Sequence, residues 1–259
     1  MEIIQEGIVI GDSSPLVKRW YYEDVTDKKE KLSEKDDALP SHVQFLMSRD
    51  LLRPFMQTWL QETTNRIMTD RSNGKNALRQ YSQQAYKLIW NAYEQNDFSG
   101  TYAYLFSSFR NIWTGANLLT TPLLNSTILF EGQGRHEEID SDLLTLGTVI
   151  HRKRPSSTTW NLHSALGFIN DSFPIILVHH IIQSSQQHSP LLAVNMQALF
   201  KKTQTQWMEC EVLLQPEIYI ESQKVELVTL DYACSFNWPT RIKTISVTII
   251  HCNTYCLGT

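Results

Sequence analysis

Hydrophobic residues recur along the chain with two different periods, and the change between them falls near residue 125. From about 46 to 120 they recur every three or four residues, as one face of an amphipathic helix requires. Such spacing predicts helices whose aromatic side chains lie in a hydrophobic core and not against a cofactor. The stripes are Phe55, Trp59 and Ile67 after Pro54, then Tyr81, Ala85, Leu88, Ile89, Ala92 and Tyr93, then Tyr102, Leu105, Phe106, Phe109, Ile112 and Trp113.

After residue 125 the hydrophobic runs become short and rich in β-branched residues, with turn residues between them, as is typical of strands. Helices first and strands afterwards favour an α+β fold over a parallel α/β fold. No glycine-rich sequence of the dinucleotide or P-loop type occurs, so a nucleotide would not bind on a Rossmann unit. The expected strands are 126–130, 147–151, 173–181, 210–214, 217–222, 225–230 and 243–250.

The charged run at residues 23–37 predicts that residues 1–45 form a solvated extension or linker. One domain would follow from 46 to 259, with a helical part at 46–125 and a β core at 126–259. A net charge of -4 gives no basic surface for nucleic-acid phosphates. No apolar run approaches the roughly 20 residues that span a bilayer, and the first residues lack the pattern of a secretory signal. We therefore expect an intracellular protein without a nucleic-acid or membrane partner.

Histidines, cysteines and basic residues give weak signals for ligand sites. His179 and His180 lie in an apolar strand without a third ligand at metal spacing, which favours packed histidines over zinc. The run 251–256 holds one histidine and two cysteines but has no partner cluster. We predict no metal site. The basic run 151–154 precedes a proline, and an exposed strand end is the favoured interpretation over a phosphate site.

Three polar stretches gain meaning from their order. Glu209 and Glu211 stand one residue apart, directly before an apolar run, but acids alternate on many exposed strands. The hydroxyl-rich stretch 156–159 lies about 50 residues earlier, and alone it would be only a polar turn. The sequence Leu-Phe-Glu-Gly-Gln at 129–133 comes about 25 residues before that stretch.

This succession resembles the arginine-directed mono-ADP-ribosyltransferases, the clade described by an R-S-E pattern. The resemblance covers roughly residues 80 to 250. It implies an α+β fold in which a helical N-terminal part precedes a two-sheet, mainly antiparallel β core. It also implies transfer of ADP-ribose from NAD to a protein acceptor with an exposed arginine. The matching blocks are Gly147-Thr148-Val149-Ile150, Ser157-Thr158-Thr159, Ala165 with Phe168, and Glu209-Cys210-Glu211-Val212-Leu213-Leu214-Gln215-Pro216.

The resemblance also implies roles for single residues. Glu211 would be the catalytic carboxylate that stabilises the positive charge developing on the ribose, and Ser157 would orient it by a hydrogen bond. Glu209 would hold the acceptor guanidinium, projecting to a similar side as Glu211 if the backbone between them is extended. NAD, as co-substrate, would be bound by Glu131, Gly132, Gln133, Ser157 and Thr158.

Glu131 is the main departure from the family, which has an arginine at this place to hold the dinucleotide phosphates. A glutamate would repel them, and Arg135 or Arg152 could supply the missing charge. Two functions stay open: an active transferase, favoured by the intact pair Glu209 and Glu211, and a catalytically weak or inactive binding module, favoured by Glu131. A glycosidase-like acid pair is disfavoured, because such carboxylates lie about 5 Å or more apart on separate elements.

Overall fold

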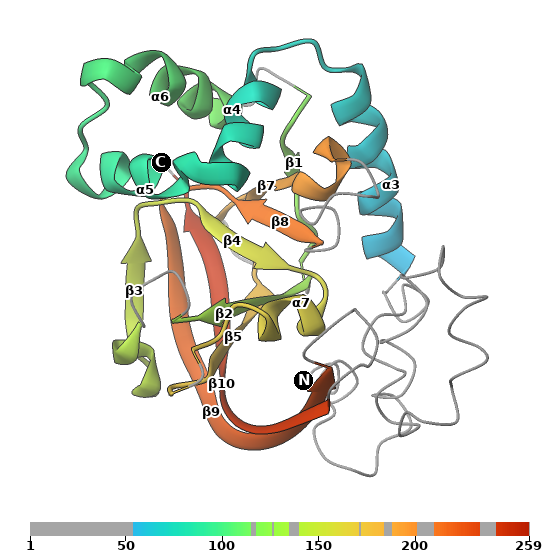
Figure 1. Cartoon of the computed structure of the whole chain (residues 1–259), viewed down its shortest axis with the longest axis vertical. Coiled ribbons are helices and arrows are strands. Elements are labelled where there is room, and N and C mark those ends of the chain that lie inside the picture. The colour runs from blue at the N-terminus through green and yellow to red at the C-terminus, as the bar shows by residue number, and fades with distance from the viewer. Residues whose placement is uncertain are drawn as a thin grey trace.

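The computed structural model describes residues 54–114, 118–125, 127–134, 140–170, 172–183, 188–200, 210–233 and 242–258. The expected N-terminal extension at 1–45 lies outside these residues, and the division of the chain at residue 45 stays a prediction. The described part has helices first and a large sheet afterwards, so it is α+β (Figure 1).

Helical segments fill the described chain from residue 54 to residue 114. In Figure 1 α4, α5 and α6 lie together over one end of the sheet, while α3 runs along its side. These segments are α3 (Pro54–Thr69), α4 (Gly74–Gln80), the π-helical turn η5 (Tyr81–Ala85), α5 (Tyr86–Gln95), η6 (Gly100–Tyr102), α6 (Ala103–Arg110) and η7 (Asn111–Thr114).

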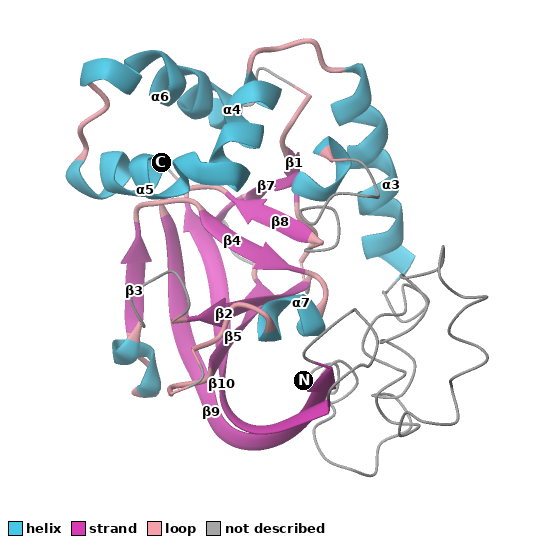
Figure 2. Ribbon diagram, in the orientation of Figure 1, coloured by secondary structure: helices cyan, strands magenta, loops and turns pink. Residues whose placement is uncertain are grey.

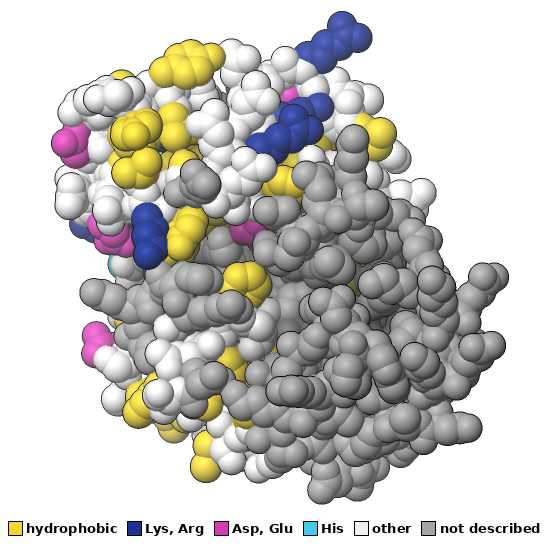
Figure 3. Space-filling model, viewed as in Figure 1, with side chains coloured by type: hydrophobic (Ala, Val, Ile, Leu, Met, Phe, Trp, Pro, Cys, Tyr) yellow, Lys and Arg dark blue, Asp and Glu magenta, His cyan; other side chains and the backbone are white. Residues whose placement is uncertain are grey.

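Most residues of the second and third stripes form a core between these helices, as their spacing predicted, whereas Leu88 and Tyr102 are exposed. Tyr81 is 1% exposed and stacks on Phe109, with ring centroids 5.3 Å apart. Ile89 and Ile112 are buried in the same cluster. On the face shown in Figure 3 hydrophobic side chains gather over α5 and α6. No helix of the described residues is long and apolar enough to cross a membrane.

The strands form one mixed, mainly antiparallel sheet in the order β1-β7-β8-β4-β2-β5-β10-β9-β3 (Figure 2). The pair β5 and β10 is parallel. The strands are β1 (Thr121–Pro122), β2 (Ile128–Gln133), β3 (Val149–Arg152), β4 (Ser156–Thr159), β5 (Ile175–Ile181), β6 (His188–Ser189), β7 (Leu192–Asn195), β8 (Glu211–Leu214), β9 (Ile218–Ala233) and β10 (Ile242–Leu257). Short helices η8 (Ser141–Leu144), α7 (Leu162–Leu166) and η9 (Met196–Leu199) lie between them.

The expected division into two sheets is not confirmed, because the pairing path is continuous. The backbone pairing is shortest between β2 and β4, where one residue pair, Phe130 and Thr159, joins the two strands. We call the strands on the β4 side of this junction the short half (β1, β7, β8, β4) and those on the β2 side the long half (β2, β5, β10, β9, β3).

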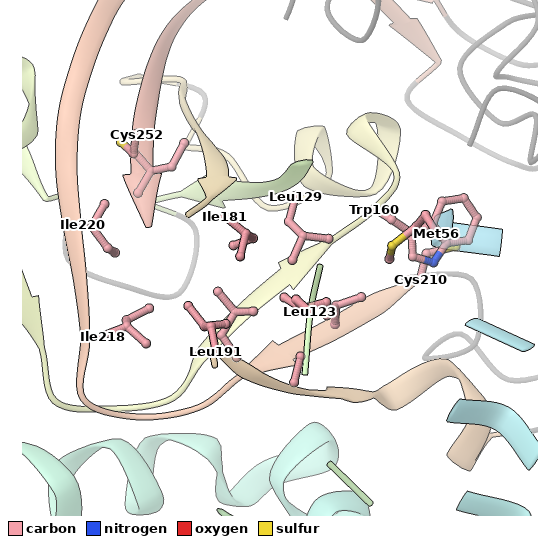
Figure 4. Close-up of a cluster of buried hydrophobic side chains, with 14 of the residues drawn as sticks. Met56, Leu123, Leu129, Trp160, Ile181, Leu191, Cys210, Ile218, Ile220 and Cys252 are labelled. Carbon is pink, nitrogen blue, oxygen red and sulfur yellow. The ribbon is translucent and has the colours of Figure 1, made fainter. Parts of the chain in front are cut away.

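A second hydrophobic core fills the space between the two halves of the sheet. In Figure 4 Met56, Trp160 and Cys210 lie together at one end of this cluster, and Ile218 and Ile220 lie at the other. The cluster draws on α3, both halves of the sheet and the turn before β8. It therefore fixes the short half against the long half, although only one residue pair joins their backbones.

Candidate active site

A cavity of about 360 Å³ lies between the helices and the junction of the two sheet halves, within the size range of small-molecule sites. We call its two sides the sheet wall and the helical wall. The sheet wall, with the α7 segment, consists of Phe130, Glu131, Gly132, Ser157, Thr158, Thr159, Ala165, Phe168 and Glu211. The helical wall consists of Tyr81, Ser82, Gln83, Tyr86 and Trp90.

Glu211 enters the cavity from the first position of β8, where it is 8% exposed. The neighbouring strand β4 fixes this position by side-chain hydrogen bonds. Thr158 Oγ1 donates to the carbonyl of Val212 at 2.6 Å, and Thr159 Oγ1 donates to the carbonyl of Cys210 at 3.1 Å. The hydroxyl-rich stretch is therefore a strand whose side chains hold the backbone on either side of Glu211.

The backbone just before Glu211 is not extended. Cys210 has φ of 52°, in the left-handed region that side chains other than glycine seldom adopt. Its side chain is 2% exposed and belongs to the core, so packing holds this conformation. The extended backbone on which the prediction for Glu209 depended is not present at Cys210, and the role of Glu209 stays a prediction. Glu209 itself lies outside the described residues.

Glu131 is buried, 2% exposed, and its carboxylate is paired. Oε2 accepts hydrogen bonds from Arg152 Nη1 at 2.7 Å and lies 3.0 Å from His179 Nε2. Arg152 is 4% exposed and also donates to Ser156 Oγ at 2.9 Å. The interpretation of residues 151–154 as an exposed strand end is therefore wrong for Arg152, since β3 ends by turning this side chain inward.

The ion pair is part of a larger buried network. Arg152 Nη2 also pairs with Asp140, and Gln133 Nε2 donates to Asp140 Oδ2 at 2.8 Å and to Glu131 Oε1 at 3.2 Å. On the other side, His179 Nδ1 lies 2.9 Å from Thr254 Oγ1. Burial alone would raise the pKa of Glu131, but the charge of Arg152 and the His179 hydrogen bond lower it below its usual range. Glu131 is therefore ionised at neutral pH.

The structure does not bring Gln133 to the cavity. This side chain is fully buried, and its amide is used by the network around Glu131. Gly132 does line the cavity, and its lack of a side chain has a clear cause. A Cβ atom at Gly132 would lie 2.0 Å from the carbonyl oxygen of Ala165, so only glycine lets α7 pack directly on β2.

The helical wall contributes residues that the sequence did not assign to the site; of these, Tyr81 was expected in the core. Tyr81 Oη lies 2.9 Å from Ser157 Oγ, and Trp90 Nε1 donates to Tyr81 Oη at 3.0 Å. The π-helical turn η5 begins at Tyr81 and places Ser82 and Gln83 on the cavity as well; such turns are frequent at functional sites. The contact between Ser157 and Tyr81 was not predicted, and orientation of Glu211 by Ser157 stays a proposal.

The adjacent histidines point to opposite faces of β5. His179 belongs to the Glu131 network. On the other face, His180 Nε2 lies 3.4 Å from His251 Nδ1. The second ring nitrogen of His251, Nε2, lies 2.7 Å from Glu226 Oε1. Burial, followed by the charges of His251 and His179, lowers the pKa of His180 to about 4. Across the described ranges, no group of three or more His, Cys, Asp and Glu residues could hold a metal ion.

The chain is similar to solved structures of bacterial ADP-ribosyltransferases. The Vis ADP-ribosyltransferase of Vibrio splendidus, in complex with agmatine, is 16% identical with a TM-score of 0.44, over 80% of this chain and 86% of that one. Plx2a, an ADP-ribosyltransferase toxin from Paenibacillus larvae, is 11% identical with a TM-score of 0.48, over 78% of this chain and 94% of the toxin chain. The enzymatic component C2-I of the C2-toxin from Clostridium botulinum is 15% identical with a TM-score of 0.49, over 76% of this chain and 47% of the C2-I chain.

No protein-family model matches the chain, and no curated protein is significantly similar to it in sequence. The structural likenesses have TM-scores below 0.5. The function proposed below therefore rests on the residues of the cavity.

Proposed function

We propose that this protein transfers ADP-ribose from NAD to an arginine side chain of a protein acceptor. The observation that carries the proposal is the composition of one cavity. Glu211 comes from β8, Ser157 and Thr158 come from β4, and together with Glu131 and Gly132 of β2 they line the same space. These residues are among those to which the sequence resemblance gives catalytic and NAD-binding roles.

The chemistry fits a buried carboxylate at the start of β8. In the transfer, the bond between C1′ of the ribose and the nicotinamide nitrogen breaks, and its electron pair neutralises the pyridinium. An arginine nitrogen then bonds to C1′ and loses a proton. Positive charge develops on the ribose between these events, and Glu211 stabilises it more strongly than it stabilises the starting state. Burial of Glu211 strengthens this effect, because little water screens its charge.

In this proposal, Glu209 binds the arginine side chain that accepts the ADP-ribose. A carboxylate is the natural bidentate partner of a guanidinium and favours its approach.

A second candidate function is a catalytically weak or inactive module that keeps the fold and binds a ligand. The presence of Glu131 in place of the family's arginine favours it. The ion pair with Arg152 reduces the repulsion that Glu131 would exert on a phosphate, and so weakens this argument.

One experiment separates the two candidates. The full chain is incubated with NAD, with and without agmatine, and free nicotinamide and ADP-ribosyl-agmatine are measured. A transferase releases nicotinamide and labels agmatine, and Glu209→Gln should lose the labelling while it keeps hydrolysis of NAD. Absence of nicotinamide release from the parent protein would reject the enzymatic proposal in favour of the binding module.

A further inference from the structure

The described residues that line the cavity include acidic side chains and no basic ones. The acidic residues are Glu131 and Glu211, and none of the described lining residues is a lysine or arginine. Two arginines are close by but belong to other contacts. Arg152 pairs with Glu131 from outside the lining, and Arg154 lies over the Trp90 ring, 4.1 Å from its centroid, with Glu94 as ion-pair partner at 3.8 Å.

Glu131 has hydrogen-bonding capacity left for a ligand. A carboxylate oxygen accepts about two hydrogen bonds. Oε2 has two partners, Arg152 and His179, whereas Oε1 has one described partner, Gln133 at 3.2 Å. Oε1 can therefore accept from a hydroxyl or amide donor in the cavity. The pyrophosphate of NAD has no proton to offer it at neutral pH and carries charge of the same sign.

The remaining lining is aromatic. Tyr86, Trp90, Phe130 and Phe168 come from both walls, and the faces of such rings attract cations. Ser82 Oγ is buried at the helical wall and makes no hydrogen bond with any described residue, so it is available to a polar group of a ligand. Rings, two carboxylates and a hydroxyl suit a flat cation with attached hydroxyls.

We propose that this cavity recognises the positively charged N-ribosylpyridinium part of its substrate and takes little affinity from phosphates, so that phosphate-free nicotinamide riboside is a ligand of the same site. This inference rests on the proposed function for the choice of pyridinium. It differs from that function in predicting which half of the dinucleotide is held. The carboxylates attract the ring cation, and Oε1 of Glu131 accepts from a ribose hydroxyl or the carboxamide.

The test compares four ligands by calorimetric titration of the full chain. NAD carries the cation and the phosphates, nicotinamide riboside the cation alone, and ADP-ribose the phosphates alone. Reduced nicotinamide riboside has nearly the same shape with a neutral ring. We expect nicotinamide riboside to bind within about tenfold of NAD, and both ADP-ribose and the reduced riboside to bind at least tenfold more weakly than nicotinamide riboside.

A matched pair of variants assigns the discrimination to the cavity. Glu211→Gln should weaken binding of nicotinamide riboside about tenfold and leave binding of the reduced riboside unchanged. Glu62→Gln, which removes the same charge from the exposed face of α3, should change neither.

Three results would overturn the inference: nicotinamide riboside binding more than tenfold more weakly than NAD, ADP-ribose binding as tightly as NAD, or equal affinity for the oxidised and reduced ribosides. These results leave the proposed function intact, because that function is judged by nicotinamide release from NAD. Tight binding of the riboside without any release would uphold the inference and reject the transferase.

Discussion

The two walls of the cavity are built by different forces. On the sheet wall, Glu131 and Glu211 are fixed by strand pairing, by hydroxyls donating to the backbone and by a buried ion pair. On the helical wall, aromatic rings are fixed by packing on one another, and one hydrogen-bond chain from Trp90 through Tyr81 reaches Ser157 on the opposite wall. The sheet wall thus supplies charge and the helical wall supplies shape.

The two walls should therefore respond differently to amino-acid substitutions. A buried charge whose partner is removed costs several kcal/mol, because nothing else in the interior solvates it. An aromatic ring that loses one hydroxyl keeps nearly all its packing. Changes of charge on the sheet wall should therefore have large effects, and polar changes on the helical wall should have small ones.

The largest effect is expected from Arg152→Met. The variant leaves Glu131 and Asp140 without their shared cation, while methionine keeps most of the side-chain volume. We expect the free energy of unfolding, measured by urea denaturation, to fall by about 3–5 kcal/mol. The control is Lys153→Met, which removes the same charge from an exposed neighbour and should change stability by no more than about 0.5 kcal/mol. Equal losses in both variants would show that the buried network contributes nothing specific.

The second largest effect is expected on the rate of catalysis, from Glu211→Gln. Glu211→Gln keeps the size of the side chain but removes the charge that faces the developing oxocarbenium-like centre. Release of nicotinamide from NAD should slow about 100-fold or more, as on removal of other groups that stabilise a transition state electrostatically. Unfolding in urea should stay close to that of the parent. A variant as fast as the parent would remove Glu211 from the catalytic role.

A third prediction uses His180, which lies on the other face of β5 from the paired His179. The pKa of His180 is about 4 in the folded protein, against 6.5 as its ordinary value. Between these pH values the unfolded chain binds a proton that the folded chain does not, so stability falls as pH is lowered from about 6.5 to 4. After allowance for partial exposure to solvent, the loss is about 2 kcal/mol at pH 4.

To test this, the free energy of unfolding is measured for the parent protein and for His180→Asn at pH 7, 5.5 and 4. The variant should lose less stability between pH 7 and 5.5 than the parent. Glu131 adds a loss in the same direction at lower pH, because its folded-state pKa is depressed. Parallel curves for the two proteins would mean that His180 does not titrate as described.

The smallest effect is expected on the helical wall. Tyr81→Phe removes the hydroxyl between Trp90 and Ser157 but keeps the ring that stacks on Phe109. A lost neutral hydrogen bond is worth about 1 kcal/mol, so kcat should fall about five- to tenfold with little change in KM. Tyr102→Phe, at a half-exposed tyrosine of the same helical part, is the control. A change in KM alone would place Tyr81 in ligand binding and not in the positioning of Ser157.

Part of this arrangement follows from the sequence alone. The runs 126–130, 173–181 and 210–214 contain or overlap β2, β5 and β8, because each is apolar and bounded by turn residues. The runs 217–222 and 225–230 were expected as two strands but form the single strand β9, since polar residues on an exposed face need not end a strand. The polar stretch Ser156–Thr159 was not expected as a strand. Its backbone pairs with β8, and the hydroxyls of Thr158 and Thr159 donate to the carbonyls of Val212 and Cys210.

For the site, the sequence identified the carboxylates and missed their surroundings. Order and spacing were enough to predict that Glu131 and Glu211 belong together. They could not show that Arg152 would turn inward, because Arg152 on β3 meets Glu131 on β2 only when the long half is assembled, with β5, β10 and β9 between these two strands in the sheet order. Nor does the stripe containing Tyr81 differ from any core stripe. The π-helical turn that brings it to the cavity leaves no trace in hydrophobic spacing.

The single pair that joins β2 to β4 has a consequence for a bound molecule. Phe130 and Thr159, which form this pair, both line the cavity, with Glu131 on the long half and Glu211 on the short half. A ligand that contacts both acids would connect the two halves a second time, across the place where the backbone connects them least. Binding should then slow amide hydrogen exchange in β2 and β4 more than elsewhere in the sheet, because local opening at the junction would require release of the ligand.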